Sequence, residues 1–252
     1  MWLYGSGNDG LPPIHLYDYR SSRGGYHAEE FLKGFSGYLI CDGFSGYNKL
    51  KGVIRCGCLA HMRRYWKEAL PGKSRKSSDK TPAEIGLDYC NQLFELEKEY
   101  ADLDADTRKA KRLETEPAIW EAYWSWLETV NPAGGSRLAK AVTYAKNQKP
   151  YMENYLLDGR CSISNNIAEN IARPYAVGRK NFLFHDTVKG ARASAIIYSL
   201  VETAKLNNLN IYAYLETVLL YMPDYKNEPE GIEELMPWSE MIQQRCQIKS
   251  KS

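Results

Sequence analysis

Three polar residues at helical spacing are the first candidates for chemistry in this chain. Asn166, Glu169 and Arg173 follow i, i+3, i+7 spacing, so a helix would present all three on one face. A carboxylate there can hold a divalent cation, while Arg173, Arg179 and Lys180 can contact phosphate groups. A structural role also fits, because Asn166 can cap the helix and Glu169 can complete a capping box. The two roles are compatible with each other.

A proline is expected to end this helix. The residue before a proline is pushed out of the α conformation, so the helix is predicted to run from Asn166 to about Arg173, just before Pro174. The basic pair that follows would then lie in a loop spanning Gly178–Phe184. The carboxylate, the pair of amides and the three cations would then lie within about two helical turns and a loop.

A second candidate carboxylate follows a predicted strand. Tyr38–Cys41 is a continuous apolar run, which is typical of a buried parallel or central strand, and it ends in Asp42-Gly43. Asp-Gly is also a strong turn signal, so a turn alone would account for Asp42. Open α/β sheets place their chemistry at strand ends, however, which makes Asp42 a candidate for catalysis as well.

Positive charge gathers between Arg55 and Lys80, although the net charge of the whole chain is only +2. The basic residues of this stretch are Arg55, Arg63, Arg64, Lys67, Lys73, Arg75, Lys76 and Lys80. Only Glu68 and Asp79 oppose them. A solvated basic face and a surface for DNA phosphates both fit this clustering. The predicted helix from Leu59 to Leu70 carries His61 together with two of these arginines.

A zinc site is the disfavoured alternative in the same region. Cys56, Cys58 and His61, with Cys41, offer soft ligands in a short span, but structural zinc usually needs two well-spaced pairs. Small buried strand residues explain Cys41 and Cys56 equally well. Six cysteines without an apolar leader indicate a reduced cytoplasmic protein, and no apolar run approaches the roughly 18 residues of a membrane span.

The periodicity predicts an α/β protein interrupted by a helical block. Strands are expected at Met1–Gly5, Ile14–Tyr19, Tyr38–Cys41 and Val53–Cys56. Helices are expected at Ala83–Leu103, Thr107–Val130, Ser136–Asn147, Ala191–Leu206 and Tyr212–Tyr221. The aromatic residues Trp120, Tyr123 and Trp124 are expected in the core between helices. The predicted domains are 1–80, a helical insertion at 81–150, a part at 151–222 that contains Glu169, and a C-terminal element at 223–252.

Several motifs together resemble the transposases of the insertion sequence 66 family. They are Asp42-Gly43-Phe44-Ser45-Gly46-Tyr47, Cys58–Arg64, Asn165–Glu169, Arg173-Pro174, Gly178–Phe184, Ser199–Lys205 and Leu235–Trp238. The resemblance covers almost the whole chain. It implies a ribonuclease H-like fold with a mixed sheet, an all-α insertion before the last catalytic residue, and C-terminal helices.

The resemblance also implies a mechanism. A triad of two Asp and one Glu would bind two Mg²⁺, for which Mn²⁺ can substitute, to cleave the DNA of an insertion sequence and transfer the strand. By motif position, the second Asp is Asp42 and the Glu is Glu169, both as catalytic residues and as metal ligands. The residues expected to contact DNA are His61, Arg63, Arg64, Asn166, Arg173, Arg179 and Lys180.

The partners implied by the resemblance are the transposon ends, the target DNA, other copies of the chain when active, and accessory proteins encoded by the element. The expected location is the bacterial cytoplasm in association with the nucleoid.

Two departures from the family pattern qualify this expectation. The first Asp of the triad belongs upstream of the segment that matches Trp2–Tyr4, and neither Asp9 nor Asp18 has the right context. Asn170 also stands where the family often has Arg, which weakens a phosphate contact at most. The chain is therefore expected to be an N-terminally truncated transposase that lacks the first strand and is inactive alone. A DNA-binding remnant without chemistry is the alternative.

Overall fold

The computed structural model describes residues 1–72 and 79–248, which form a mixed α/β structure. It divides into two compact units. The central unit is Arg23–Asn166, and the terminal unit combines Met1–Ser22 with Ile167–Ser252. Three members of the predicted basic cluster, Lys73, Arg75 and Lys76, lie outside the described residues.

The central unit contains a parallel pair of strands. β3 (Gly37–Ile40) pairs with β4 (Val53–Cys56), with Tyr38 opposite Ile54, and the N–H of Cys41 extends the ladder by donating to the carbonyl of Cys56 at 3.1 Å. The helix α1 (Tyr26–Phe31) precedes the strand pair. The 3-10 turn η1 (Ser45–Lys49) lies between its two strands, and the helix α2 (Leu59–Glu68) follows it. The parallel ladder brings the end of β3 and the end of β4 to the same edge.

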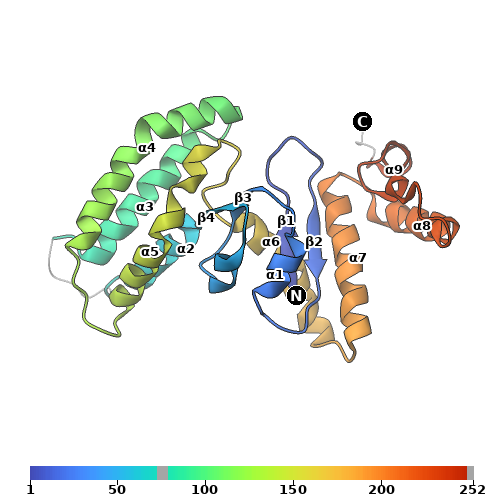
Figure 1. Ribbon diagram of the computed structural model, residues 1–252, viewed down its shortest axis with the longest axis horizontal. Coiled ribbons are helices and arrows are strands. Elements are labelled where there is room, and N and C mark those ends of the chain that lie inside the picture. Colours follow the sequence, from blue (N-terminus) through green and yellow to red (C-terminus); the bar gives the residue numbers. More distant parts are fainter. Residues whose placement is uncertain (73–78, 249–252) are drawn as a thin grey trace. The chain divides into compact units, whose positions relative to one another are not determined.

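A helical layer packs on α2 within this unit (Figure 1). It consists of α3 (Pro82–Glu99), α4 (Ala105–Glu128), α5 (Arg137–Met152) and the 3-10 turn η2 (Asn154–Leu157). Thr81, Asp104 and Ser136 cap the three α-helices through their side chains. The predicted helices and their aromatic core are confirmed, since Trp120 and Tyr123 are each 1% exposed. However, α5 continues through Pro150, beyond the predicted end at Asn147.

A buried arginine holds the helical layer to the chain segment that follows it. Arg112 on α4 is 1% exposed, and its Nε and Nη2 each donate to the carboxylate of Glu97 at 2.6 Å. Its remaining N–H groups donate to the carbonyls of Tyr155 and Asp158, both at 3.3 Å, and of Cys161 at 3.0 Å. A guanidinium can satisfy this many partners because it carries five N–H donors.

The terminal unit contains an antiparallel pair of strands, β1 (Trp2–Gly5) and β2 (His15–Asp18), as predicted. The other elements are α6 (Asn166–Phe182), α7 (Val188–Leu206), α8 (Ile211–Tyr221), η3 (Met222–Tyr225), η4 (Ile232–Leu235) and α9 (Glu240–Cys246). Across the residues that the structure describes, the four strands make two separate two-stranded ladders.

α7 runs alongside β2 (Figure 1). Its hydroxyl groups take the place of a neighbouring strand along the outer edge of β2. Thr203 Oγ1 accepts from the N–H of His15 at 3.1 Å and donates to its carbonyl at 3.0 Å. Ser199 Oγ, one helical turn earlier, accepts from the N–H of Tyr17 at 2.8 Å. These bonds satisfy backbone groups that an isolated hairpin would leave unpaired.

The predicted end of the helix near Arg173 is wrong, because α6 continues through Pro174 to Phe182. The predicted loop Gly178–Phe184 is therefore largely helical. Pro174 removes one backbone hydrogen bond, but Tyr175 just beyond it packs on Tyr17 and Tyr198, with ring centroids 6.3 and 5.4 Å apart. This packing is the tertiary gain that offsets the missing bond.

We predict that Thr203→Val lowers the free energy of unfolding of the terminal unit by about 1–3 kcal/mol, because it leaves the edge groups of His15 without a partner. Thr217→Val is the matched control, since this buried hydroxyl donates to the carbonyl of Ala213 within its own helix. Urea denaturation of both variants measures the difference. Equal destabilisation by the two substitutions would contradict the role assigned to the edge.

Burial raises the pKa of Glu116 from its ordinary value of 4.5 to about 7. The side chain is fully buried on α4, and one carboxylate oxygen accepts a hydrogen bond from the hydroxyl of Tyr155. The folded state therefore binds this proton more tightly than the unfolded state does. The stabilising effect is fully present below about pH 4.5 and is lost as the pH rises through about 7.

We predict that Glu116→Gln removes this pH dependence, because an amide does not titrate. Between pH 4.5 and 8 the wild-type chain should lose about 3 kcal/mol relative to the variant. Urea denaturation at several pH values measures this difference, and Glu121→Gln, at an exposed position of the same helix, is the control. A wild-type profile that runs parallel to that of Glu116→Gln would refute the assignment.

Candidate functional site

Asp42 stands two residues beyond the end of β3, at the edge where the parallel pair ends. It is half-buried, and its Oδ1 accepts the N–H of Phe44 at 3.0 Å. The turn role of Asp42 is therefore present. Within the described part of the chain, no hydrogen bond to its Oδ2 is found. One carboxylate oxygen thus serves the turn, and the other is available for a ligand.

Aromatic and amide side chains surround this carboxylate. Burial, with a smaller contribution from the charge of Asp42, raises the pKa of Tyr47 to about 12 and raises the pKa of Tyr144 on α5 as well. Gly43 lies against α5. A Cβ built on it would be only 2.9 Å from ring carbon Cε2 of Tyr144 and 3.1 Å from Gln148 Nε2. The helical layer therefore contributes side chains to the surroundings of Asp42.

Arg55, a member of the predicted basic cluster, is buried close to this region. Its guanidinium lies 4.0 Å from the ring centroid of Tyr151 and donates to the side-chain oxygen of Asn48. It is 7% exposed, so it is not part of a surface that could contact DNA phosphates. Its role is to join β4 to α5 and η1.

Glu169 lies in the first turn of α6 and is exposed to solvent. The positive end of the helix dipole favours a carboxylate at this position. As a cap, Asn166 would stand just before the first helical residue. The helix instead begins at Asn166, so this residue lies inside the first turn. Arg173 is exposed one turn further along the same face, as its spacing predicted.

The two candidate carboxylates belong to different units. Asp42 is part of the central unit and Glu169 is part of the terminal unit. Carboxylate oxygens are the ligands that Mg²⁺ prefers, so the chemistry of both residues fits that ion. Among residues 1–72 and 79–248, no group of three or more His, Cys, Asp or Glu side chains is arranged to hold a metal ion.

The cysteines that offered a zinc site have other surroundings. Cys41, Cys56 and Cys58 are buried free thiols. A hydrogen bond with Cys161, together with burial, raises the pKa of Cys56, which disfavours the thiolate that zinc requires. Cys58 Sγ accepts the backbone N–H of Asn165 at 3.2 Å, so this sulfur helps to hold the segment that leads into α6.

The DNA-binding candidates on α2 differ in their surroundings. Arg63 donates through Nε to the side-chain oxygen of Asn91 on α3 at 2.7 Å, so its guanidinium is held in place. Arg64 is exposed, and its only described ion pair is a 4.0 Å contact with Glu68. His61 is half-buried. The sequence did not point to Asn91 as the residue that positions Arg63.

The terminal unit has a groove at the end of α6, with a volume of about 860 Å³. Arg179 and Lys180 line it, together with the connection from α6 to α7. The ring of Phe182 lies 4.9 Å from that of His185, whose Nε2 is 2.9 Å from the hydroxyl of Tyr175. Phe184 on the connection is 70% exposed. The groove thus combines two cations with exposed aromatic surface, and sequence reasoning missed it because it predicted a loop after Pro174.

No helix in the described ranges is both long enough and apolar enough to cross a membrane.

Comparison with known proteins gives a family match over most of the chain. Residues 1–193 match the family described as Transposase IS66 family, and residues 199–238 match the IS66 C-terminal element. The first of these segments contains both Asp42 and Glu169. No solved structure matches the chain.

The similar curated proteins include three from Sinorhizobium fredii. Uncharacterized protein y4qI is 31% identical over 94% of this chain and 46% of its own length. Uncharacterized proteins y4hP and y4jD are each 28% identical over 90% of this chain, and over 44% and 46% of their own lengths. The chain thus spans less than half the length of these relatives. On the strength of the match over residues 1–193, the chain belongs to the IS66 transposase family.

Proposed function

We propose that this chain provides the catalytic region of a DDE-type transposase that cleaves the DNA of an insertion sequence and joins it to a target. The observation that carries the proposal is the carboxylate of Asp42, which follows a parallel strand in the matched region and keeps one oxygen outside the turn. A ribonuclease H-like sheet is part of the proposal, and the support for it is the family match over residues 1–193.

Asp42 and Glu169 are the proposed metal ligands and catalytic residues. When bound, two Mg²⁺ ions, or Mn²⁺ in their place, would supply activation of a water or a 3′-hydroxyl and stabilisation of the leaving oxygen. The contribution of the chain is to hold two carboxylates at fixed backbone positions, one in a turn after β3 and one in the first helical turn of α6. Zinc has no part in this proposal.

By motif position, the family resemblance assigns Asp42 and Glu169 to a DDE triad, and it assigns no third carboxylate among these residues. We therefore propose that the chain by itself binds DNA and Mg²⁺ but does not cut DNA. A non-catalytic DNA-binding protein is the second candidate function, favoured by the groove that carries Arg179 and Lys180. In both cases the partners are transposon ends and target DNA in the bacterial nucleoid. Assembly into oligomers and accessory proteins of the element belong to the active enzyme.

The DNA contacts are proposed on two surfaces, one in each unit. On α2 they are made by Arg64 at the surface, Arg63 held by Asn91, and His61. On α6 they are made by Asn166 and Arg173 near the start of the helix and by the two groove cations near its end. Cations contact backbone phosphates, while the exposed rings of the groove can stack on bases.

We predict that Glu169→Gln weakens Mg²⁺ binding by at least about 10-fold, because an amide lacks the charge that holds the ion. Isothermal titration calorimetry on the 252-residue chain measures this. Asp224→Asn, at another exposed carboxylate of the terminal unit, is the control. Unchanged Mg²⁺ binding by Glu169→Gln would favour the non-catalytic DNA-binding function.

We predict that Arg179→Ala combined with Lys180→Ala flattens the salt dependence of DNA binding. Loss of two phosphate contacts should reduce the slope of log Kobs against log salt concentration by about 1.8 for duplex DNA. Fluorescence anisotropy with a labelled duplex over a range of salt concentrations measures the slope. Lys226→Ala, an exposed cation of the same unit, should leave it unchanged. A double variant with the wild-type slope would exclude the groove as a DNA contact.

A further inference from the structure

Two buried polar atoms close to Asp42 have no hydrogen-bond partner among the described residues. They are the hydroxyl oxygen of Tyr144 and Oε1 of Gln148, both on α5. Gln148 is only 7% exposed. Buried polar side chains are almost always paired, and an unsatisfied one costs about 1–3 kcal/mol. Two such atoms one helical turn apart therefore point to a bound ligand that would supply the missing hydrogen bonds.

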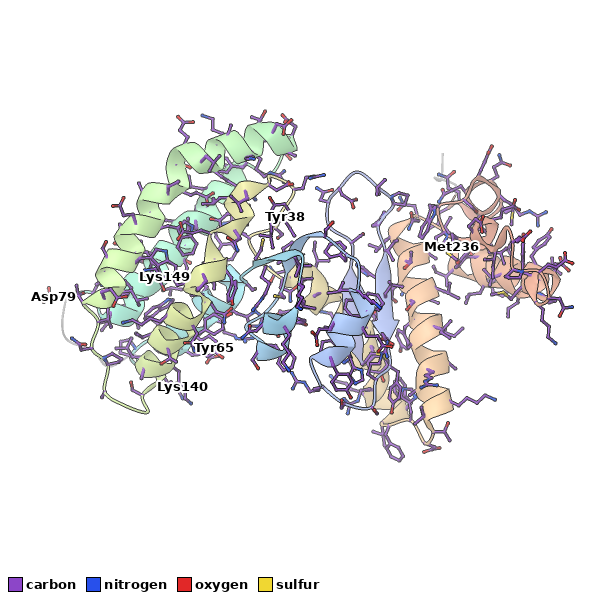
Figure 2. The ribbon with its side chains drawn as sticks, in the orientation of Figure 1. Tyr38, Tyr65, Asp79, Lys140, Lys149 and Met236 are labelled. Carbon is purple, nitrogen blue, oxygen red and sulfur yellow. The ribbon has the colours of Figure 1, made fainter. Side chains whose placement is uncertain are left out.

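The geometry directs both side chains toward the turn that carries Asp42. Residues at i and i+4 share one face of a helix, and this face of α5 abuts Gly43, the residue directly after Asp42. Tyr65, labelled in Figure 2, fixes the ring of Tyr144 by stacking on it, with centroids 4.6 Å apart and planes inclined by 29°. The ring of Tyr144 and the amide group of Gln148 thus both lie beside the residue that follows Asp42.

The chemistry of this oxygen cluster matches a hydrated divalent cation. Mg²⁺ is bound through one or two carboxylates and keeps several of its water ligands. Those waters need hydrogen-bond partners, which an amide oxygen and a phenol hydroxyl supply. Substitution of residues that hold the ligands of a metal by hydrogen bonds typically weakens metal binding by about 10–100-fold.

We propose that Tyr144 and Gln148 are positioning residues of the Asp42 metal site, holding water ligands of the ion through the Tyr144 hydroxyl and Gln148 Oε1. This inference rests on the proposed function, because it takes Asp42 as a metal ligand. It gives the helical layer a part in the chemistry, since α5 would set the orientation of the hydrated ion. It also requires a residue without a side chain at position 43, because a Cβ there would meet both side chains.

Binding of Mn²⁺ to the whole chain tests this proposal without requiring enzyme activity. Electron paramagnetic resonance of free Mn²⁺ gives the dissociation constant for the wild type, Asp42→Asn, Tyr144→Phe and Gln148→Met. We expect Asp42→Asn to remove the site, and the other two variants to weaken it by about 10-fold each. Thr143→Val and Asn147→Ala, at exposed positions of the same helix, should bind as the wild type does.

Gln148→Glu separates a role at the ion from a role in folding. A carboxylate in place of the amide should tighten Mn²⁺ binding, because it adds a negative charge near the cation. A purely structural glutamine predicts no tightening. Circular dichroism melts of each variant confirm that the chain folds, and the sign of the Gln148→Glu effect still decides the question if Gln148→Met unfolds.

The outcomes distinguish this inference from the proposed function. If Asp42→Asn loses Mn²⁺ while Tyr144→Phe, Gln148→Met and Gln148→Glu bind as the wild type does, the two orphaned atoms bind only a buried water. The inference then fails, and the metal role of Asp42 stands. If wild type and Asp42→Asn bind Mn²⁺ alike, the metal role of Asp42 fails and this inference fails with it.

Discussion

The buried guanidinium of Arg112 is the interaction on which the architecture of the central unit depends. An isolated buried charge would be very costly, but here two hydrogen bonds to Glu97 and three to backbone carbonyls compensate it. The carbonyls belong to a segment with little regular structure, from Tyr155 to Cys161. Arg112 therefore fixes this segment, from the end of η2 to Cys161, on the helical layer.

The segment fixed by Arg112 leads directly to the start of α6. After Cys161, the carbonyl of Ile163 accepts the N–H of Leu59, and the N–H of Asn165 donates to Cys58 Sγ. Both partners lie where β4 passes into α2. The segment that precedes α6 is thus tied to the beginning of α2. The polar chemistry of the chain is placed on elements whose backbone is held by buried hydrogen bonds rather than on free loops.

In the proposed function, Asp42 would satisfy a structural and a chemical requirement together. Its Oδ1 fixes the turn by accepting from Phe44, which also fixes the direction of the carboxylate. The second oxygen then points from a rigid position, as a metal ligand must. The turn interpretation and the catalytic interpretation of Asp42-Gly43 are therefore complementary.

Much of the secondary structure was predictable, because local periodicity determines it. The strand pairs and the helices of the 81–150 region lie where apolar spacing and capping residues placed them. The end of α6 was not predictable from local rules, since the contacts of Tyr175 with Tyr17 depend on residues far apart in sequence. Asp42 and Glu169 could be selected as candidates because each belongs to a local motif. Tyr144 and Gln148 could not, because their position depends on tertiary packing. Only the packing of α5 on Gly43 reveals their position.

If Asp42 is a ligand of the proposed metal centre, an iron ion bound in place of Mg²⁺ lies beside residue 42. Bound Fe²⁺, with ascorbate and hydrogen peroxide, generates hydroxyl radicals that cut the nearby backbone, so the cut positions report which residues surround the ion. Cuts near residue 42 are expected, suppressed by excess Mg²⁺ and absent in Asp42→Asn. A chain that is not cut near residue 42, or cuts there that persist in Asp42→Asn, would contradict the metal role of Asp42.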